Sequence, residues 1–171
     1  MRISKRLLLI FGLLISCVGC DQTSKSVAKT YLSETEAISL VGGSVRLQMA
    51  KNYGAFLSVG DSLPASWRSG LFLGGVGIVL AGLVAYALLF KQVTSLSTSA
   101  VALVVGGGLS NLIDRLQYGG YVVDFINVGI GPLRTGVFNL ADVAIMAGVL
   151  AFVLSGPLER RASNEEIEPT R

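Results

Sequence analysis

The chain has 171 residues, of which 51% are hydrophobic and 15% are charged, and its mean hydropathy is +0.64. Because soluble domains usually carry about a quarter charged residues, this composition indicates an integral membrane protein. The net charge of +3 is small and dispersed, which argues against a nucleic-acid surface. The sequence has no histidine, which excludes Ser-His-Asp triads, Cys-His pairs and HExxH zinc sites.

The first segment combines a basic start at residues 2–6 with a charge-free run at 7–20. This run is short for a spanning helix and resembles a signal-peptide core, and its LISC sequence resembles a motif for lipid attachment. Asp21 and Lys25, however, have the i,i+4 spacing of a favourable helical ion pair. That pair predicts a first helix that continues past the apolar run.

Residues 31–69 form the longest polar segment, where we expect a small extracytoplasmic domain. Two stretches of alternating apolar residues, 38–41 and 44–49, flank a pair of glycines and predict a β-hairpin. Asn52 and Gly54 follow this hairpin, and their types alone are also typical of an ordinary turn.

Four apolar segments predict transmembrane helices, and a charged tail that we expect to be disordered follows the last of them. The spans are 7–29, 71–90, 96–113 and 138–158, and the tail is 159–171. A stripe of small residues, Gly77, Ala81 and Ala85, is expected to let a neighbouring helix approach. The basic first flank favours cytoplasmic termini. The sequence therefore predicts one polytopic membrane domain, residues 1–158, all-α except for a small extracytoplasmic β-segment.

Three aspartates lie at the ends of these apolar runs. Two of them close the same pattern, Asn111-x-x-Asp114 and Asn139-x-x-Asp142, and Asp124 lies between them in a predicted strand. Residues three apart share a helix face, so each asparagine is expected to support the site that its aspartate enters. A carboxylate within a membrane helix costs about 2.5–3.5 kcal/mol on insertion scales, so these aspartates require a partner or a function.

Ion pairing explains only some of these acids. Asp114 can pair with Arg115 or Arg134, whereas Asp124 and Asp142 lack an obvious cation. Two neighbouring carboxylates share one proton, so one can activate water while the other protonates a carbonyl oxygen. An ion-coupled carrier and a purely structural subunit remain alternatives, and a cleavage assay separates both from a hydrolase.

Five motifs, in this order and spacing, resemble those of the lipoprotein signal peptidase (signal peptidase II) family. They are DQTSK at 21–25, NYGAF at 52–56, GGGLSNLIDR at 106–115, VVDF at 122–125 and FNLAD at 138–142. The resemblance implies an aspartyl endopeptidase of the bacterial inner membrane that cleaves diacylglyceryl-modified prolipoproteins just before the lipidated cysteine. It implies four transmembrane helices capped by a small β-cradle, cytoplasmic termini and an active site at the outer face.

The resemblance also implies roles for individual residues. Asp124 and Asp142 match the catalytic pair, and no metal or other cofactor is expected. The matching substrate-binding or supporting residues are Asp21, Lys25, Asn52, Gly54, Asn111, Asp114, Arg115, Asn139 and Ala141. NYGAF is one residue shorter than the usual family run, and Ser110 stands where glycine is more usual. The expected partners are lipidated prolipoproteins and membrane lipids, without nucleic acid.

Small residues are candidates for a groove through which a membrane-embedded substrate reaches the dyad. They are Gly77, Ala81, Gly107, Ala144 and Gly148, provided that some face an opening and not a sealed helix contact. Asn52 and Gly54 are the expected clamp over the site, because asparagine can both donate and accept and glycine permits close backbone approach.

Overall fold

The computed structural model describes residues 2–54, 63–64, 67–68, 70–90 and 93–167. Ala55 and Phe56 of the NYGAF motif, the predicted link at Lys91 and the end of the tail from residue 168 lie outside the described residues. The elements are α1 (Ile3–Tyr31), β1 (Ile38–Leu40), the 3₁₀ turn η1 (Val41–Gly43), β2 (Val45–Asn52), the π-helical turn η3 (Gly70–Gly75), α3 (Val76–Leu89), α4 (Ser95–Gln117), β3 (Val122–Ile130), β4 (Leu133–Arg134) and α5 (Leu140–Ile167). The fold is mostly helical, with one small sheet.

Apolar helices occupy the predicted spans. In the described part of the chain, three are long and apolar enough to cross a membrane: Ile3–Tyr31, Gly70–Leu89 and Ser95–Gln117. The apolar part of α5, Leu140–Gly156, is shorter, so the prediction of four spans is confirmed only in part. α5 itself continues to Ile167, which corrects the expectation of a disordered tail from residue 159. Arginine, glutamate and alanine in this stretch are good helix formers and account for the continuation.

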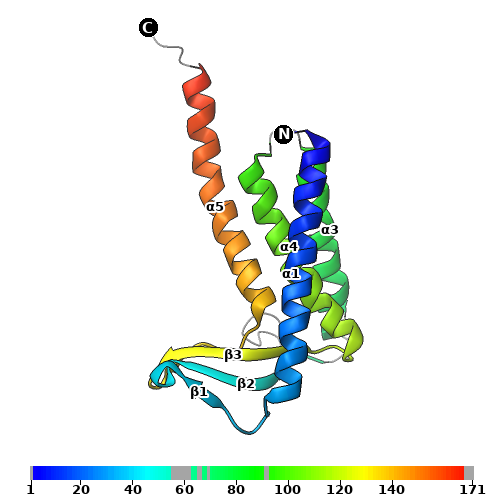
Figure 1. The fold of residues 1–171 in the computed structure, drawn as a ribbon. Coiled ribbons are helices and arrows are strands. Elements are labelled where there is room, and N and C mark those ends of the chain that lie inside the picture. The colour runs from blue at the N-terminus through cyan, green and yellow to red at the C-terminus, as the bar shows by residue number, and fades with distance from the viewer. Residues whose placement is uncertain (1, 55–62, 65–66, 69, 91–92, 168–171) are drawn as a thin grey trace.

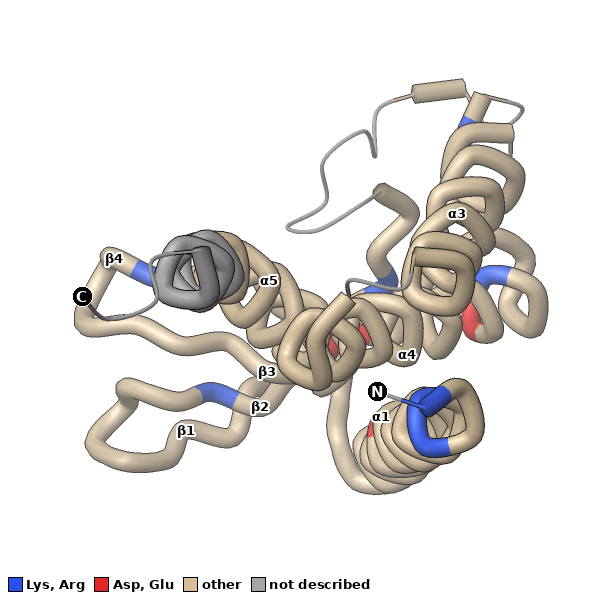
Figure 2. Tube along the Cα trace, turned by 90° about the horizontal axis from the view of Figure 1, so that it is seen from above, with Lys and Arg blue, Asp and Glu red and all other residues tan. Residues whose placement is uncertain are grey.

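Helix α4 lies at the centre of the bundle and contacts each of the other three helices (Figures 1 and 2). Its three consecutive glycines each face a different neighbour. A Cβ added at Gly106 would lie 2.8 Å from the Cβ of Cys17 in α1. One added at Gly107 would overlap the carbonyl oxygen of Ala141 in α5. One added at Gly108 would lie 2.7 Å from a leucine methyl group of α3.

We expect Gly107→Ala to lower the free energy of unfolding by about 1–3 kcal/mol, because the new methyl group must push α4 and α5 apart. Gly82→Ala in α3 is the matched control, since nothing lies within 4 Å of its added Cβ. Alanine also favours a helix over glycine, so this control should keep or gain stability. Thermal unfolding in detergent measures both, and equal melting temperatures would show that the interface of α4 with α5 relaxes freely.

The small-residue stripe on α3 does not receive a neighbouring helix, so that prediction is wrong. Nothing lies within 4 Å of a Cβ added at Gly77, and Ala81 and Ala85 are exposed. α3 packs instead through Leu80 and Ala87, both buried in the core. The small residues that allow close approach belong to α4, where leucine from α3 fills the space beside a glycine.

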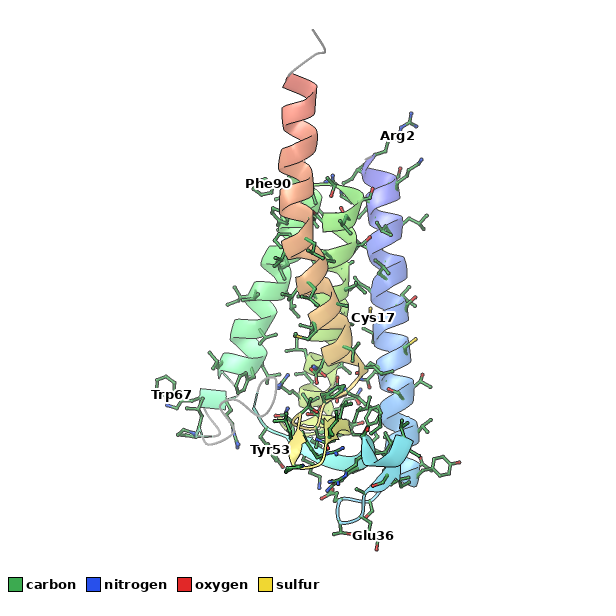
Figure 3. All side chains as sticks on the ribbon, turned by 90° about the vertical axis from the view of Figure 1, so that its left-hand side faces the viewer. Arg2, Cys17, Glu36, Tyr53, Trp67 and Phe90 are labelled. Carbon is green, nitrogen blue, oxygen red and sulfur yellow. The ribbon has the colours of Figure 1, made fainter. Side chains whose placement is uncertain are left out.

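A four-stranded antiparallel sheet in the order β1-β2-β3-β4 lies at the end of the bundle opposite the two chain termini (Figure 1). The predicted hairpin is confirmed, because β1 pairs with β2 and the turn Val41–Gly43 joins them. Figure 3 shows the same polarity, with Arg2 and Phe90 at one end and Glu36, Tyr53 and Trp67 at the other.

Two irregularities bend the sheet beside Asp124. The register between β2 and β3 shifts between Leu47 and Ala50. On the other edge of β3, the amides of Phe125 and Ile126 both donate to the carbonyl oxygen of Phe138, at 3.0 and 2.8 Å. Bulges of this kind redirect side chains and are frequent beside functional sites.

Candidate active site

The predicted site residues all lie in one buried network where the sheet meets the helices. They are Asp21, Lys25, Asn52, Gly54, Asn111, Asp114, Arg115, Asp124, Asn139, Ala141 and Asp142. They come from the end of α1, the end of β2 and the residues after it, α4, β3 and the start of α5. Polar groups are seldom buried without hydrogen-bond partners, so the contacts of each one indicate what it does.

Asp124 projects from β3 into a shell of amide donors. Asn52 donates its Nδ2 to Oδ2 of Asp124 at 2.9 Å, and Asn139 donates its Nδ2 to Oδ1 at 2.7 Å. Burial, and next the nearby charge of Asp142, raise the pKa of Asp124 to about 7, although the two amide donors oppose the rise. Its carboxyl group is therefore poised to exchange a proton near neutral pH.

Asp142 is fixed by the start of α5. Asn139 accepts a hydrogen bond at Oδ1 from the backbone amide of Asp142 at 2.9 Å, and its own backbone amide donates to Oδ2 of Asp142 at 3.2 Å. This reciprocal arrangement is a capping box, in which two otherwise unpaired backbone donors find side-chain acceptors. The second motif, Asn139-x-x-Asp142, thus acts as predicted: the asparagine supports its own aspartate and also binds Asp124.

Asn111 supports Asp142 and not the aspartate of its own motif. Its Nδ2 donates to Oδ1 of Asp142 at 2.9 Å. Its Oδ1 accepts from Nζ of Lys25 at 2.9 Å and from Nδ2 of Asn139 at 3.1 Å. Because an ammonium group can only donate, Lys25 fixes which end of the Asn111 amide faces the dyad.

A buried ion triad lies beside the two carboxylates. Nζ of Lys25 is 2.6 Å from Asp21 and 2.9 Å from Asp114, and all three side chains are almost fully buried. The predicted pair of Asp21 with Lys25 is present. Asp21 accepts from the backbone amide of Ala141 at 2.9 Å, and Asp114 accepts from that of Val123 at 3.0 Å. The ion triad therefore binds the backbone amide of the residue just before each of the two carboxylates, Ala141 before Asp142 and Val123 before Asp124.

The alternative pairing of Asp114 with Arg115 or Arg134 is wrong. Adjacent residues on a helix point in different directions, so Asp114 and Arg115 do not pair with each other. Asp114 instead forms an ion pair with Lys25. Arg115 donates to the carbonyl oxygen of Gly54 at 2.6 Å, which holds the segment after β2 against α4. Among the described residues, the ion pairs join Lys25 and Lys51 to acids other than Asp124 and Asp142. These two carboxylates accept hydrogen bonds from amide donors instead.

Two further residues of the network, Gln22 and Ser110, were not predicted. Nε2 of Gln22 donates to Asp114 at 2.7 Å and to the hydroxyl of Ser110 at 3.1 Å. The Ser110 hydroxyl donates to Asp21 at 2.8 Å and is fully buried. Serine in place of the more usual glycine at position 110 thus adds a hydrogen bond to Asp21 of the ion triad. Their positions inside DQTSK and GGGLSN were the available signal.

Two apolar grooves open on α5. The larger, of about 440 Å³, is lined by Thr135, Phe138, Asp142, Val143, Met146, Ala147 and Leu150. The smaller, of about 170 Å³, lies between α3, α4 and α5 and is lined by Leu83, Val101, Val104, Val149, Phe152 and Val153. The predicted use of Gly107 and Gly148 as groove residues is wrong. Both lie in the sealed contact of α4 with α5, where a Cβ at Gly148 would be 2.6 Å from the carbonyl oxygen of Ala100.

The chain matches known proteins over most of its length. The family model for signal peptidase (SPase) II matches residues 13–156. Lipoprotein signal peptidases of Shigella boydii serotype 4 and Escherichia coli K12 are 40% and 39% identical to the chain over 126 residues, which cover 71% of this chain and 73% of each relative. The chain belongs to the signal peptidase II family. It is therefore a peptidase, and the family assignment that the sequence motifs predicted is confirmed.

Solved structures share the signal peptidase II fold seen here. One bacterial membrane enzyme, 24% identical, has a TM-score of 0.77 over 100% of this chain and 97% of its own. A second, 23% identical, has a TM-score of 0.69 over 91% and 94%. At this level of identity the likeness supports the fold, a helical bundle with a small antiparallel sheet.

Proposed function

We propose that the chain is an aspartyl endopeptidase that removes signal peptides from diacylglyceryl-modified prolipoproteins by cleaving just before the lipidated cysteine. The observation that carries the proposal is the convergence of Asp124 and Asp142 on a shared set of asparagine amides in a buried site. The relatives are called lipoprotein signal peptidases, which supports the substrate class. Membership of a peptidase family supports hydrolysis over ion transport or a purely structural role.

In the proposed reaction, the two carboxylates share one proton. One carboxylate takes a proton from water, which attacks the peptide carbonyl carbon, while the carboxylic acid gives its proton to the carbonyl oxygen. The proton gained by the base then passes to the leaving amine as the tetrahedral intermediate collapses, and one hydroxyl proton of the intermediate returns to the other carboxylate, which restores the shared proton. Asn139 and Asn111 hold the two carboxylates in place, and the raised pKa of Asp124 keeps a protonated group available near neutral pH.

We place the dyad at the outer face of the bacterial inner membrane, with both termini in the cytoplasm. Arg2, Lys5 and Arg6 lie at the end of α1 that is far from the dyad, and basic flanks favour the cytoplasmic side. In this orientation α5 is the fourth span. The apolar grooves along α5 then face the bilayer, where a substrate that carries a diacylglyceryl group and an apolar signal helix can lie.

Cleavage of a lipidated prolipoprotein by the purified protein tests the proposal. We expect efficient cleavage before the modified cysteine and very slow cleavage of the unlipidated precursor, because the diacylglyceryl group keeps the scissile bond at the membrane surface beside the dyad. The unlipidated precursor of the same sequence is the matched control. Comparable cleavage rates on the two precursors would show that the enzyme does not recognise the lipid.

The pH dependence of the cleavage rate should reflect the protonation state of Asp124. We expect activity to fall as the pH rises through about 7, because Asp124 then loses the proton that it shares with Asp142. Asn52→Ala removes a donor that stabilises the ionised form, so the pKa should rise and the alkaline limb should move to higher pH. The same variant should raise KM and lower kcat. A limb that stays in place or moves to lower pH would contradict the role of Asn52.

A further inference from the structure

We propose that Phe72 is a positioning residue of the active site, whose ring holds Arg115 and thereby keeps the Gly54 backbone beside the dyad. Phe72 belongs to η3, the π-helical turn that leads into α3, and it lies outside the motifs that predicted the site. It is buried, with 7% of its surface exposed. The kinetic consequence rests on the proposed peptidase reaction, whereas the contact itself can be tested without cleavage.

The π-helical turn brings Phe72 to the buried side of α3. Leu80 marks that side, because it belongs to the core between the helices. In a regular helix, the residue about two turns before Leu80 shares its face, and that residue is Leu73. A π-helical turn contains more residues, so Phe72 is buried in its place and Leu73 is only partly buried. Turns of this kind are frequent at functional sites, and this one brings a ring to α4.

The Phe72 ring contacts the buried guanidinium group of Arg115. Cζ of Arg115 is 5.4 Å from the centre of the ring, within the range of a cation–π interaction. Arg115 is only 7% exposed, and its Nε has no hydrogen-bond partner among the described residues. Burial therefore removes hydration that the hydrogen bonds of Arg115 do not fully replace. The ring attracts the cation where water cannot reach it, and a cation–π interaction is strongest in such a desolvated place.

Arg115 connects Phe72 to the residues around the dyad. Its Nη2 donates to the carbonyl oxygen of Gly54 at 2.6 Å. The backbone amide of Gly54 donates to Oδ1 of Asn52 at 2.9 Å, which turns the Nδ2 end of that side chain toward Asp124. The contacts that start at Phe72 therefore end at a carboxylate of the dyad. A ring that fixes Arg115 also fixes the amide donor of Asp124.

Fluorination of the ring tests this role, because fluorine withdraws electron density from the ring face and weakens its attraction for a cation while the shape changes little. In the full-length enzyme, Phe72 is replaced by phenylalanine that carries one, two or three fluorines. We expect kcat/KM for a lipidated prolipoprotein to fall stepwise, to roughly a tenth with three fluorines. KM should rise and kcat should fall together, as for Asn52→Ala, because the same amide is displaced.

The matched control is the same fluorinated series at Phe11, which is 60% exposed on α1 and should leave both kinetic constants unchanged. A ring that serves only as apolar packing would keep its function in every fluorinated form. Unchanged kinetic constants along the Phe72 series would therefore overturn the proposal. Phe72→Leu keeps an apolar side chain and removes the ring, so it should lower kcat/KM at least as far as three fluorines do. Full activity of Phe72→Leu would also overturn the proposal.

Fluorine NMR separates the contact from the proposed reaction. Arg115→Gln removes the cation, so the resonance of a fluorinated ring at position 72 should shift in this variant. Lys29→Gln, which removes the cation beside the Tyr118 ring, is the matched control and should leave the resonance in place. An unmoved resonance in folded Arg115→Gln would overturn the proposed contact. A moved resonance in an enzyme that cleaves no prolipoprotein would uphold the contact and overturn the proposed reaction instead.

Discussion

Asp124→Asn and Asp142→Asn should each lower cleavage of a lipidated prolipoprotein by roughly 10³-fold or more, because proton transfer by a paired acid and base is lost as a unit. Asparagine keeps the shape of the side chain, so binding of the precursor should survive. The measurement is the initial rate of cleavage by the purified variants at saturating substrate.

Folding of these variants separates chemistry from structure. Burial raises the pKa of Asp124, so the fold disfavours its charged form and a neutral amide should not lower the melting temperature. Glu34→Gln, which removes a carboxylate from an exposed ion pair, is the matched control and should keep full activity. Substantial turnover by either dyad variant would remove that residue from the proposed pair. Inhibition by EDTA that added metal reverses would replace the dyad with a metal site.

Local sequence patterns predicted what lies within one element. The i,i+4 spacing of Asp21 and Lys25 gave their ion pair, and the capping box of Asn139 with Asp142 follows from residues three apart at a helix start. Both depend only on helix geometry and neighbouring side chains. Apolar runs likewise located the helices, and alternation located the hairpin.

Partners across elements were not predictable in the same way. The spacing of Asn111 and Asp114 shows that they share a helix face, but that face meets two neighbours at once. Asn111 binds Asp142 of α5, while Asp114 binds Lys25 of α1. Helical spacing does not say which element lies opposite, so the individual partners of Asn111 and Asp114 within their shared site were not predictable.

The packing of the small residues shows the same limit. Gly77 on α3 and Gly107 on α4 have equivalent local sequence signals, since each is a glycine in an apolar helix. Gly77 faces open space, and Gly107 lies against the backbone of α5. Only the arrangement of the other three helices around α4 distinguishes them, and that arrangement depends on contacts far apart in the sequence.

Lys25→Met should lower the free energy of unfolding by about 3–5 kcal/mol, because it leaves the buried carboxylates of Asp21 and Asp114 without a cation. Activity should fall in the same variant even below its melting temperature. The two acids hold the backbone beside Asp142 and Asp124, and Lys25 orients the Asn111 amide. Thermal unfolding in detergent and the cleavage rate measure the two effects.

A compensating variant distinguishes loss of charge balance from loss of packing. The double variant Lys25→Met with Asp114→Asn keeps only one of the two unpaired buried carboxylates. It should therefore be more stable than Lys25→Met alone, although Asp114→Asn by itself is destabilising. Lys51→Met is the matched control, since Lys51 pairs with Glu34 at the exposed surface and its loss should change stability little. A double variant no more stable than Lys25→Met alone would attribute the effect to packing. Because the network holds both strand β3 and helix α5, restored stability should return part of the cleavage rate as well.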